Sequence, residues 1–194
     1  MKILITGSNG LLGQKLVYQL RGESNNTCIA TARGENRLVK RDGYVYETLD
    51  ITDKNNVEKV FAKHLPDVVI NTAAMTNVDA CETEREACWQ MNVTAVENQV
   101  KTLESLKNKN YNPHFIHLST DFIFDGTHGP LDENENPNPL SYYAESKLAA
   151  EKIVQASALD WAIARTVLVF GIVDNMSRSN IVLWVKSNLE QGKT

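Results

Sequence analysis

The chain has 194 residues, of which 42% are hydrophobic and 23% are charged, and its formal net charge is −4. This length suffices for one well-buried domain and part of a second, while the acidic balance argues against binding to nucleic acid or anionic membranes through bulk charge. No apolar run approaches the roughly 20 residues of a membrane span, and three cysteines without C-x-x-C spacing fit a reducing cytoplasm better than disulfides or zinc.

The first predicted element is a buried strand over Lys2–Thr6, because this run is short, apolar and rich in β-branched residues. It begins directly after Met1, so we expect no signal peptide. Gly7, Gly10 and Gly13 follow, and apolar residues then recur at helical spacing. A glycine turn between a strand and a helix lets a diphosphate approach the backbone and the free N–H groups of the helix start. The stretch predicts a dinucleotide site, the alternative being a glycine-rich turn without a ligand.

Further along the chain, strand and helix patterns alternate. Strands are predicted over residues 27–32, 44–49, 67–71, 114–119 and 161–169, and helices over 54–64, 79–107, 141–156 and 178–191. We expect Asp53 to cap the helix over 54–64 and the long helix to be broken or bent near Met91. Residues 124–140, rich in glycine, proline and acidic residues, predict a surface loop. The alternation predicts an α/β fold, a Rossmann-like doubly wound parallel sheet with helices on both faces.

Ligands of such sheets bind at the carboxyl ends of the strands. The strand over 27–32 ends at Arg33, with Arg37 close behind, where a carboxylate would select NAD and an arginine suits the 2′-phosphate of NADP. We therefore expect NADPH, with NADH as the second choice, unless the two arginines are merely solvated. Asp50 and Ile51 end the third strand, and small residues follow the fourth.

Acid–base chemistry is predicted where the fifth strand ends at Ser119-Thr120-Asp121. Tyr143 and Lys147, four residues apart on a helix, share one face near this end. The ammonium of Lys147 is expected to lower the pKa of Tyr143, and Thr120 to orient a carbonyl substrate. The alternative is an ordinary helix with one buried tyrosine. The histidines show no metal spacing, and His117 is expected to be a packed core residue.

The motifs together resemble those of the extended short-chain dehydrogenase/reductases, and among these the dTDP-4-dehydrorhamnose reductases are the most similar. The glycine turn and the Y-x-x-x-K pattern are marks of the whole superfamily. The runs Ala73-Ala74-Met75-Thr76-Asn77-Val78-Asp79 and Ser119-Thr120-Asp121-Phe122-Ile123-Phe124-Asp125-Gly126 are much more specific.

This resemblance implies NAD(P)H-dependent reduction of the C4 keto group of a dTDP-6-deoxy-hexulose, as in dTDP-L-rhamnose biosynthesis. It implies Tyr143 as proton donor, Lys147 as ligand of the nicotinamide ribose, Thr120 as third member of the triad and Asn92 as support of a proton relay. It also implies a dTDP-sugar substrate and a homodimer as the candidate assembly. Some members of the family form metal-linked dimers, but the residues that bind this metal have no match here, so we expect no metal. The cofactor contacts expected are Gly7, Asn9, Gly10, Leu11, Leu12, Gly13, Arg33, Asp50, Ile51, Ala73, Ala74, Tyr143 and Lys147.

We expect residues 1–171 to form the dinucleotide-binding domain and residues 172–194 to begin a truncated C-terminal substrate-binding region. Two other functions remain open. The regulatory β-subunit of methionine adenosyltransferase resembles the chain in fold and in the run after the fifth strand, but serves as a binding partner. A sensor that binds NADP without turnover is the third reading, in which the triad would be idle.

Overall fold

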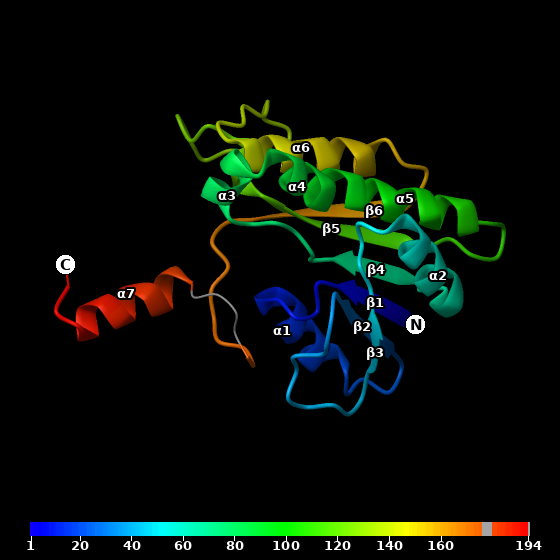
Figure 1. The fold of residues 1–194 in the computed structure, drawn as a ribbon. Helices are drawn as coiled ribbons and strands as arrows, with labels where there is room; N and C mark the ends of the chain where they lie inside the picture. The colour runs from blue at the N-terminus through cyan, green and yellow to red at the C-terminus, as the bar shows by residue number, and fades with distance from the viewer. Residues whose placement is uncertain (176–179, 194) are drawn as a thin grey trace.

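The computed structural model describes residues 1–175 and 180–193 and contains a six-stranded parallel sheet with the strand order β3-β2-β1-β4-β5-β6 (Figure 1). The strands are β1 (Lys2–Thr6), β2 (Thr27–Ala32), β3 (Val45–Thr48), β4 (Val68–Asn71), β5 (His114–Thr120) and β6 (Asp160–Thr166). The order reverses between β1 and β4, so the carboxyl ends of these two strands flank the crevice where ligands of open α/β sheets bind. The predicted Rossmann-like sheet is confirmed.

Strand β6 ends earlier than predicted, at Thr166 instead of Val169. Thr166 pairs with Thr120, the last residue of β5, and the chain of β5 then turns into the short 3₁₀ helix η2 (Asp121–Ile123). Beyond Thr166 the apolar run therefore has no neighbouring strand, and it leaves the sheet as an extended segment. A continuous apolar pattern does not show where the partner strand stops.

The helices form layers on both faces of the sheet, as predicted. Their bounds are α1 (Leu11–Leu20), α2 (Lys54–His64), α3 (Val78–Thr83), α4 (Arg85–Trp89), α5 (Ala95–Leu106), α6 (Tyr142–Gln155) and α7 (Ile181–Glu190). Figure 1 shows α2 to α6 on one face, α1 on the other, and α7 to the side of the sheet. Asp53 caps α2 by accepting hydrogen bonds from the N–H groups of Asn55 and Asn56, as predicted. The start of the last predicted helix, residues 178 and 179, lies outside the described residues.

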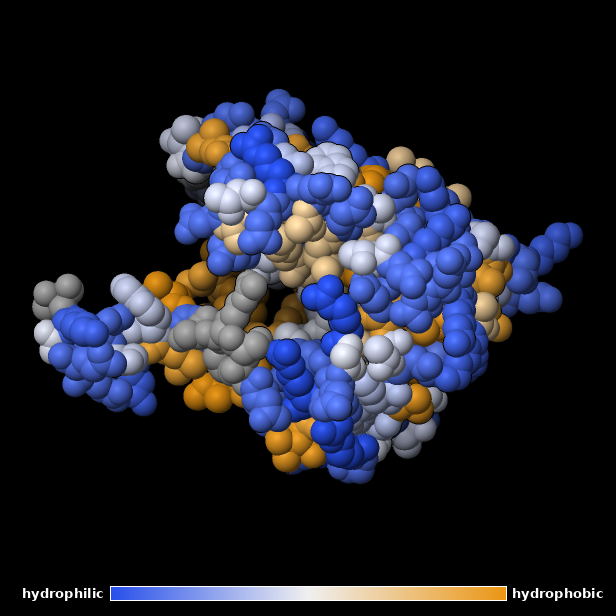
Figure 2. All heavy atoms as spheres, viewed as in Figure 1, coloured by the Kyte–Doolittle hydropathy of each residue, from blue (hydrophilic) through white to orange (hydrophobic). Residues whose placement is uncertain are grey.

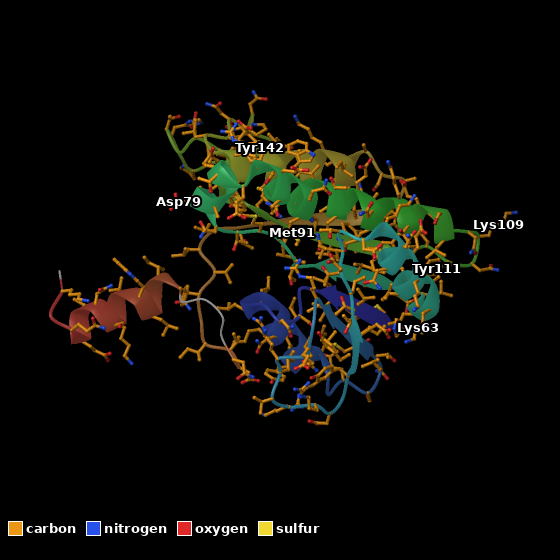
Figure 3. All side chains as sticks on the ribbon, viewed as in Figure 1. Lys63, Asp79, Met91, Lys109, Tyr111 and Tyr142 are labelled. Atoms are coloured by element: carbon orange, nitrogen blue, oxygen red, sulfur yellow. The ribbon has the colours of Figure 1, made fainter. Side chains whose placement is uncertain are left out.

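The long helix predicted over 79–107 is divided into α3, α4, the π-helical segment η1 (Gln90–Thr94) and α5. At the end of η1 the N–H of Ala95 donates to the carbonyl of Gln90, five residues earlier, so the helix widens at the place where a bend near Met91 was expected. Glu84, with φ −115° and ψ 51°, adds a second break that the sequence did not indicate. Met91 lies on the side of the helix facing the sheet (Figure 3).

Side chains of β1 alternate between two apolar cores. Leu4 points into the core shared with α2, α5 and α6, where Phe61 and Phe115 are fully buried. Ile3 and Ile5 point into the core beneath α1, which contains Val17. A strand that is buried on both faces needs apolar residues at every position, and this explains the unbroken run at the N-terminus.

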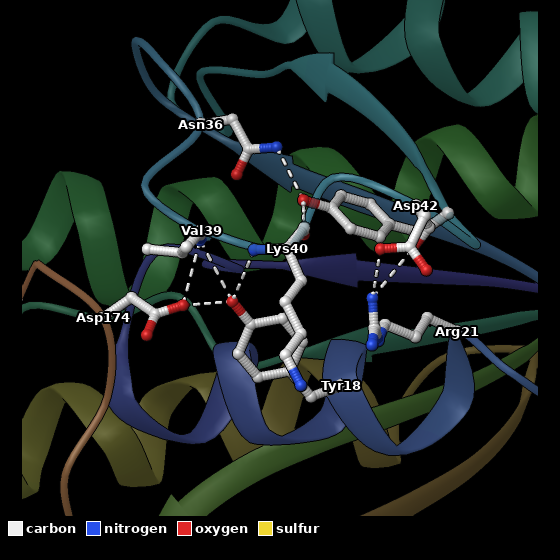
Figure 4. A network of polar contacts seen from close by, with 8 residues as sticks. Tyr18, Arg21, Asn36, Val39, Lys40, Asp42 and Asp174 are labelled. Carbon is white, nitrogen blue, oxygen red and sulfur yellow. Dashed lines mark hydrogen bonds and ion pairs between the residues drawn. The ribbon is translucent and has the colours of Figure 1, made fainter.

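The segment after β6 is fastened to α1 by polar contacts. The backbone N–H and C=O of Asp174 bond to the side-chain amide of Gln14 at 3.0 and 2.9 Å, and the Asp174 carboxylate accepts from the Tyr18 hydroxyl and from the N–H of Val39 (Figure 4). Apolar side chains of residues 167–172 stay exposed beside α7 (Figure 2). Buried residues are absent from the described length of α7.

Candidate functional site

The glycine turn after β1 is held at close range to the chain that follows β4. Gly7 has φ +70°, and a Cβ built there would lie 2.8 Å from the Cα of Ala73. A Cβ on Gly13 would lie 2.3 Å from the carbonyl oxygen of Gly7, because α1 packs directly on the turn. Both positions therefore require glycine, and the turn brings the first N–H groups of α1 to the crevice between β1 and β4.

A cleft of about 730 Å³ opens at the carboxyl ends of the strands. It joins the start of α1 on one side to the end of β5 and the start of α6 on the other. A neighbouring hollow of about 360 Å³ lies over the ends of β2, β3 and β4. Of the predicted site residues, those lining the cleft or the hollow are Gly7, Asn9, Gly10, Leu11, Leu12, Arg33, Asp50, Ile51, Ala73, Ala74, Thr120, Tyr143 and Lys147.

Two predicted residues do not line either space. Gly13 acts through packing against Gly7, as described above. The Asn92 side chain instead ties the loop after β4 to α6: its Oδ1 accepts from the N–H of Met75 at 2.8 Å, and its Nδ2 donates to the Met75 carbonyl and to Ser146 Oγ, both at 3.0 Å. These contacts occupy its amide, so the geometry gives Asn92 a positioning role.

The side chain of Asn9 also bonds to backbone groups, those of the loop after β2. Its Nδ2 donates to the carbonyl of Glu35 at 2.8 Å, and its Oδ1 accepts from the N–H of Arg37 at 2.9 Å. The glycine turn thereby carries the loop after β2 and brings Arg37 to the cleft. Arg33 lines the same region; its side chain is 74% exposed, and its Nη1 lies 3.9 Å from the carboxylate of Asp50. The Arg33–Asp50 pair is at the limit of ion-pair distance, so the exposed guanidinium of Arg33 is available to a phosphate.

Thr120 and Tyr143 meet where β5 ends and α6 begins. Thr120 Oγ1 accepts from the N–H of Phe122 and donates to Asp121, each at 3.2 Å. The Tyr143 ring packs edge-on against Phe122, with ring centroids 6.3 Å apart. Burial raises the pKa of Tyr143, and a hydrogen bond with Thr120 acts in the opposite direction. The expected lowering by Lys147 is therefore not found: burial is the largest influence, and the pKa of Tyr143 is raised.

Lys147 is almost fully buried beneath the cleft. Its Nζ donates to the carbonyl of Leu118 at 2.6 Å and lies 3.3 Å from Nε2 of His117. Burial lowers the pKa of Lys147 to about 8, against the opposing influence of the Glu151 carboxylate and of Cys88. His117, expected as a packed core residue, is fully buried and contacts the lysine directly. The site thus combines a protonated phenol with an amine whose charge changes near neutral pH.

Sequence reasoning missed the wall of the cleft that the segment after β6 provides. Val167, Leu168, Val169 and Val173 line it, together with Met75 and Thr76 from the loop after β4. The apolar run at 167–169 was assigned to the strand, and only the end of pairing at Thr166 releases it to the cleft. The one available signal was the mismatch in length between the predicted fifth and sixth strands.

Residues 1–175 and 180–193 hold neither a cluster of metal ligands nor a membrane-spanning helix. Among them there is no group of three or more His, Cys, Asp or Glu side chains arranged to hold a metal ion. No helix within residues 1–175 or 180–193 has the length and apolar character needed to cross a membrane.

The chain is similar to proteins of known families. A family model described as RmlD substrate binding domain matches residues 1–193. The "Probable low-salt glycan biosynthesis reductase Agl14" of Haloferax volcanii is 35% identical over 100% of this chain and 62% of its own length. "Methionine adenosyltransferase 2 subunit beta" of Bos taurus is 30% identical over 94% of this chain and 51% of its own length.

Solved structures are similar as well. The dTDP-4-dehydrorhamnose reductase of Bacillus anthracis, crystallised with NADP, is 26% identical with a TM-score of 0.76 and covers 98% of this chain and 60% of its own. The chain therefore spans about half to three fifths of the length of these proteins.

Proposed function

Because the chain belongs to the RmlD substrate binding domain family, we propose that it takes part in the NAD(P)H-dependent reduction of a nucleotide-linked keto sugar. The observation that carries this proposal is the single cleft that joins the glycine turn to Thr120, Tyr143 and Lys147. One side of it suits a diphosphate and the other suits a carbonyl, which is the layout that a nicotinamide dinucleotide and its substrate require.

The residues of the cleft fit a dinucleotide. Gly7 and Gly10 line the hollow with their backbone, and the start of α1 offers N–H groups to phosphate oxygens. When bound, a reduced nicotinamide supplies a hydride to the carbonyl carbon of the substrate. Arg33 and Arg37 favour the 2′-phosphate of NADPH over the ribose hydroxyl of NADH.

Side chains of the chain itself then donate the proton and position the groups that exchange it. Tyr143 donates it to the carbonyl oxygen, because a phenol is protonated at neutral pH and can act as a general acid. Thr120 orients the phenol and the carbonyl, and Lys147 supplies positive charge beneath them. Asn92 holds the loop that carries Met75, which lines the cleft.

As substrate we propose dTDP-4-dehydrorhamnose or a close dTDP-6-deoxy-hexulose, reduced at C4, in the cytoplasm. The support is the similarity to the Bacillus anthracis reductase and the specific run after β5. We further propose that residues 1–171 bind the dinucleotide and that residues 172–194 begin the region that binds the sugar. The assembly that we propose is a homodimer.

A regulatory role is the second candidate, favoured by the 30% identity to a methionine adenosyltransferase subunit over 94% of the chain. In that case the cleft would bind NADP without turnover, and the protein would act by binding a catalytic subunit. The triad argues for the reductase, since a binding subunit has no use for a positioned acid.

The decisive experiment mixes the purified protein with NADPH and dTDP-4-dehydrorhamnose and follows NADPH absorbance, with the dTDP product identified by mass spectrometry. We expect NADPH to disappear in step with formation of a product heavier by two hydrogens. NADPH that binds with a measurable Kd but is not consumed, together with capture of a methionine adenosyltransferase catalytic subunit, would replace the reductase by the regulatory role.

A further inference from the structure

A chain of buried polar side chains runs beneath the cleft from β1 to α6. Thr6 Oγ1 donates to Asn71 Oδ1 at 2.6 Å, Asn71 Nδ2 lies 3.1 Å from His117 Nδ1, and His117 Nε2 lies 3.3 Å from Lys147 Nζ. None of these four residues is more than 5% exposed. Because these side chains are buried away from water, the hydrogen bonds with neighbouring side chains determine which atom carries each proton.

Gln99 and Thr6 determine the orientation of the Asn71 amide. Gln99 Nε2 donates to the carbonyl of Ala95 at 3.0 Å and to Asn71 Oδ1 at 3.4 Å, and the Thr6 hydroxyl donates to the same oxygen. Asn71 Oδ1 is thus the acceptor of the amide, and its Nδ2 donates toward His117. The nitrogen of His117 that receives this bond, Nδ1, carries no proton.

The proton of His117 therefore lies on Nε2, which faces Lys147. Burial and the charge of Lys147 hold the pKa of His117 well below its usual value, so the ring is neutral and has one N–H. An ammonium offers only donors, and a second donor pointing at it opposes the charged state. A neutral amine accepts this N–H and still donates to the Leu118 carbonyl, 2.6 Å away.

The other titratable groups that act on Lys147 come from two elements. Glu151 lies on α6 itself and Cys88 lies on α4, while Tyr143 of α6 lines the same cleft. The carboxylate of Glu151 favours the ammonium, but it is engaged with Arg165 of β6 at 2.8 Å. His117 is the group whose hydrogen bond changes from opposing to favourable when Lys147 loses a proton.

We propose that Asn71 and His117 form a positioning pair for Lys147, in which Asn71 fixes the His117 tautomer with Nε2–H toward the amine and thereby stabilises uncharged Lys147. This inference rests on the proposed reductase function, where it has a direct use. After Tyr143 gives its proton to the substrate, an N–H bond of the Lys147 ammonium breaks and the O–H bond of Tyr143 re-forms, with water in the cleft passing the proton between them, because Lys147 Nζ itself contacts Leu118 and His117. His117 stabilises the neutral amine that remains, and water entering through the cleft returns the proton to it.

The first test is independent of activity. Long-range ¹⁵N–¹H spectra of ¹⁵N-histidine-labelled protein report the tautomer of His117, and titration of the ¹³Cε signal of Lys147 reports its pKa. We expect Nε2–H in the unmodified protein. In His117→Phe we expect the pKa of Lys147 to rise by about one to two units, because one opposing hydrogen-bond donor is gone. Burial alone predicts an unchanged or lower pKa, since phenylalanine is less polar.

Asn71→Asp is the second variant, because a carboxylate accepts from His117 and should move its proton to Nδ1. We expect the pKa of Lys147 to rise there as well. Asn98→Asp is the matched control: it adds the same charge on α5, where Asn98 bonds to the carbonyls of Ile51 and Thr52, and should leave the His117 tautomer unchanged. Circular dichroism checks the fold of each variant, and the tautomer in the unmodified protein decides the question if a variant does not fold.

An Nδ1–H tautomer in the unmodified protein, or an unchanged pKa of Lys147 in a folded His117→Phe protein, overturns the inference. Activity separates this from the proposed function. NADPH consumption with the Nδ1–H tautomer leaves the reductase standing without the positioning pair. The expected spectra without any NADPH consumption support the pair and remove the reductase. In an active enzyme the alkaline limb of kcat should move to higher pH in His117→Phe.

Discussion

Replacing Tyr143 with phenylalanine isolates the proposed proton donor, because it removes one hydroxyl and preserves the ring. The ring packs edge-on against Phe122 at 6.3 Å, a contact that phenylalanine keeps. The hydroxyl contributes a hydrogen bond with Thr120, which is worth about 1 kcal/mol to folding. Its removal also relieves the burial of a polar group, so the free energy of unfolding should change by less than about 1 kcal/mol.

The effect on turnover should be far larger. A positioned general acid contributes about 10²–10⁴-fold to rate, which corresponds to roughly 3–5 kcal/mol of transition-state stabilisation. Because the proposed mechanism places Tyr143 at the carbonyl and not at the adenosine half of the cofactor, the Kd for NADPH should stay within about twofold. Loss of kcat with retained binding and retained stability is the signature of a missing proton donor.

The assay compares kcat, the NADPH Kd and the denaturant midpoint for the unmodified protein, Tyr143→Phe and Tyr142→Phe. Tyr142 is the matched control: it lies next to Tyr143 on α6, but its ring packs against Trp89 and Arg85 at the outer face of the helix (Figure 3). We expect Tyr142→Phe to retain most of its turnover. Near-normal kcat in Tyr143→Phe, or equal losses in both variants, would refute the assignment of Tyr143 as the acid.

Three further expectations concern the cofactor, the buried lysine and the glycine turn. Arg33→Ala should reduce the preference for NADPH over NADH by about tenfold, since an exposed guanidinium makes a charge-assisted hydrogen bond of the lower usual strength. Equal Kd values for both cofactors in the unmodified protein would contradict this. Lys147→Met should abolish turnover and remove a pH dependence of stability. The pKa of Lys147, lowered to about 8, means that burial of the ammonium disfavours the folded state below pH 8. Between pH 8 and pH 10 the free energy of unfolding of the unmodified protein should therefore rise by about 2 kcal/mol relative to that of the variant; parallel stability-versus-pH curves for the two proteins would refute the shift. Gly13→Ala should cost about 1–3 kcal/mol in denaturant unfolding, because its Cβ would lie 2.3 Å from Gly7 O, whereas Gly22→Ala, with open space around its Cβ, should be nearly neutral.

The fold could be predicted from the sequence because its elements are specified locally. The run from Ile3 to Ile5 is apolar at every position, as the centre of a strand buried on both faces must be. The side chain of Asp53 caps α2 by accepting from the N–H groups of Asn55 and Asn56, at most three residues away. Spacing alone also placed Tyr143 and Lys147 on one helix face beside the end of β5, because a helix repeats every 3.6 residues.

The sequence by itself determined the order of strands and helices, the glycine turn and the residue types at the strand ends. The tertiary structure decided how these residues are used. Asn92 meets Met75 across 17 residues, His117 meets Lys147 across 30, and Gln14 meets Asp174 across 160. Packing of separate elements creates each of these contacts, so local spacing carries no trace of them. The same holds for the pKa of Tyr143, which burial raises against the expected influence of Lys147, because the water excluded around a side chain depends on everything packed against it.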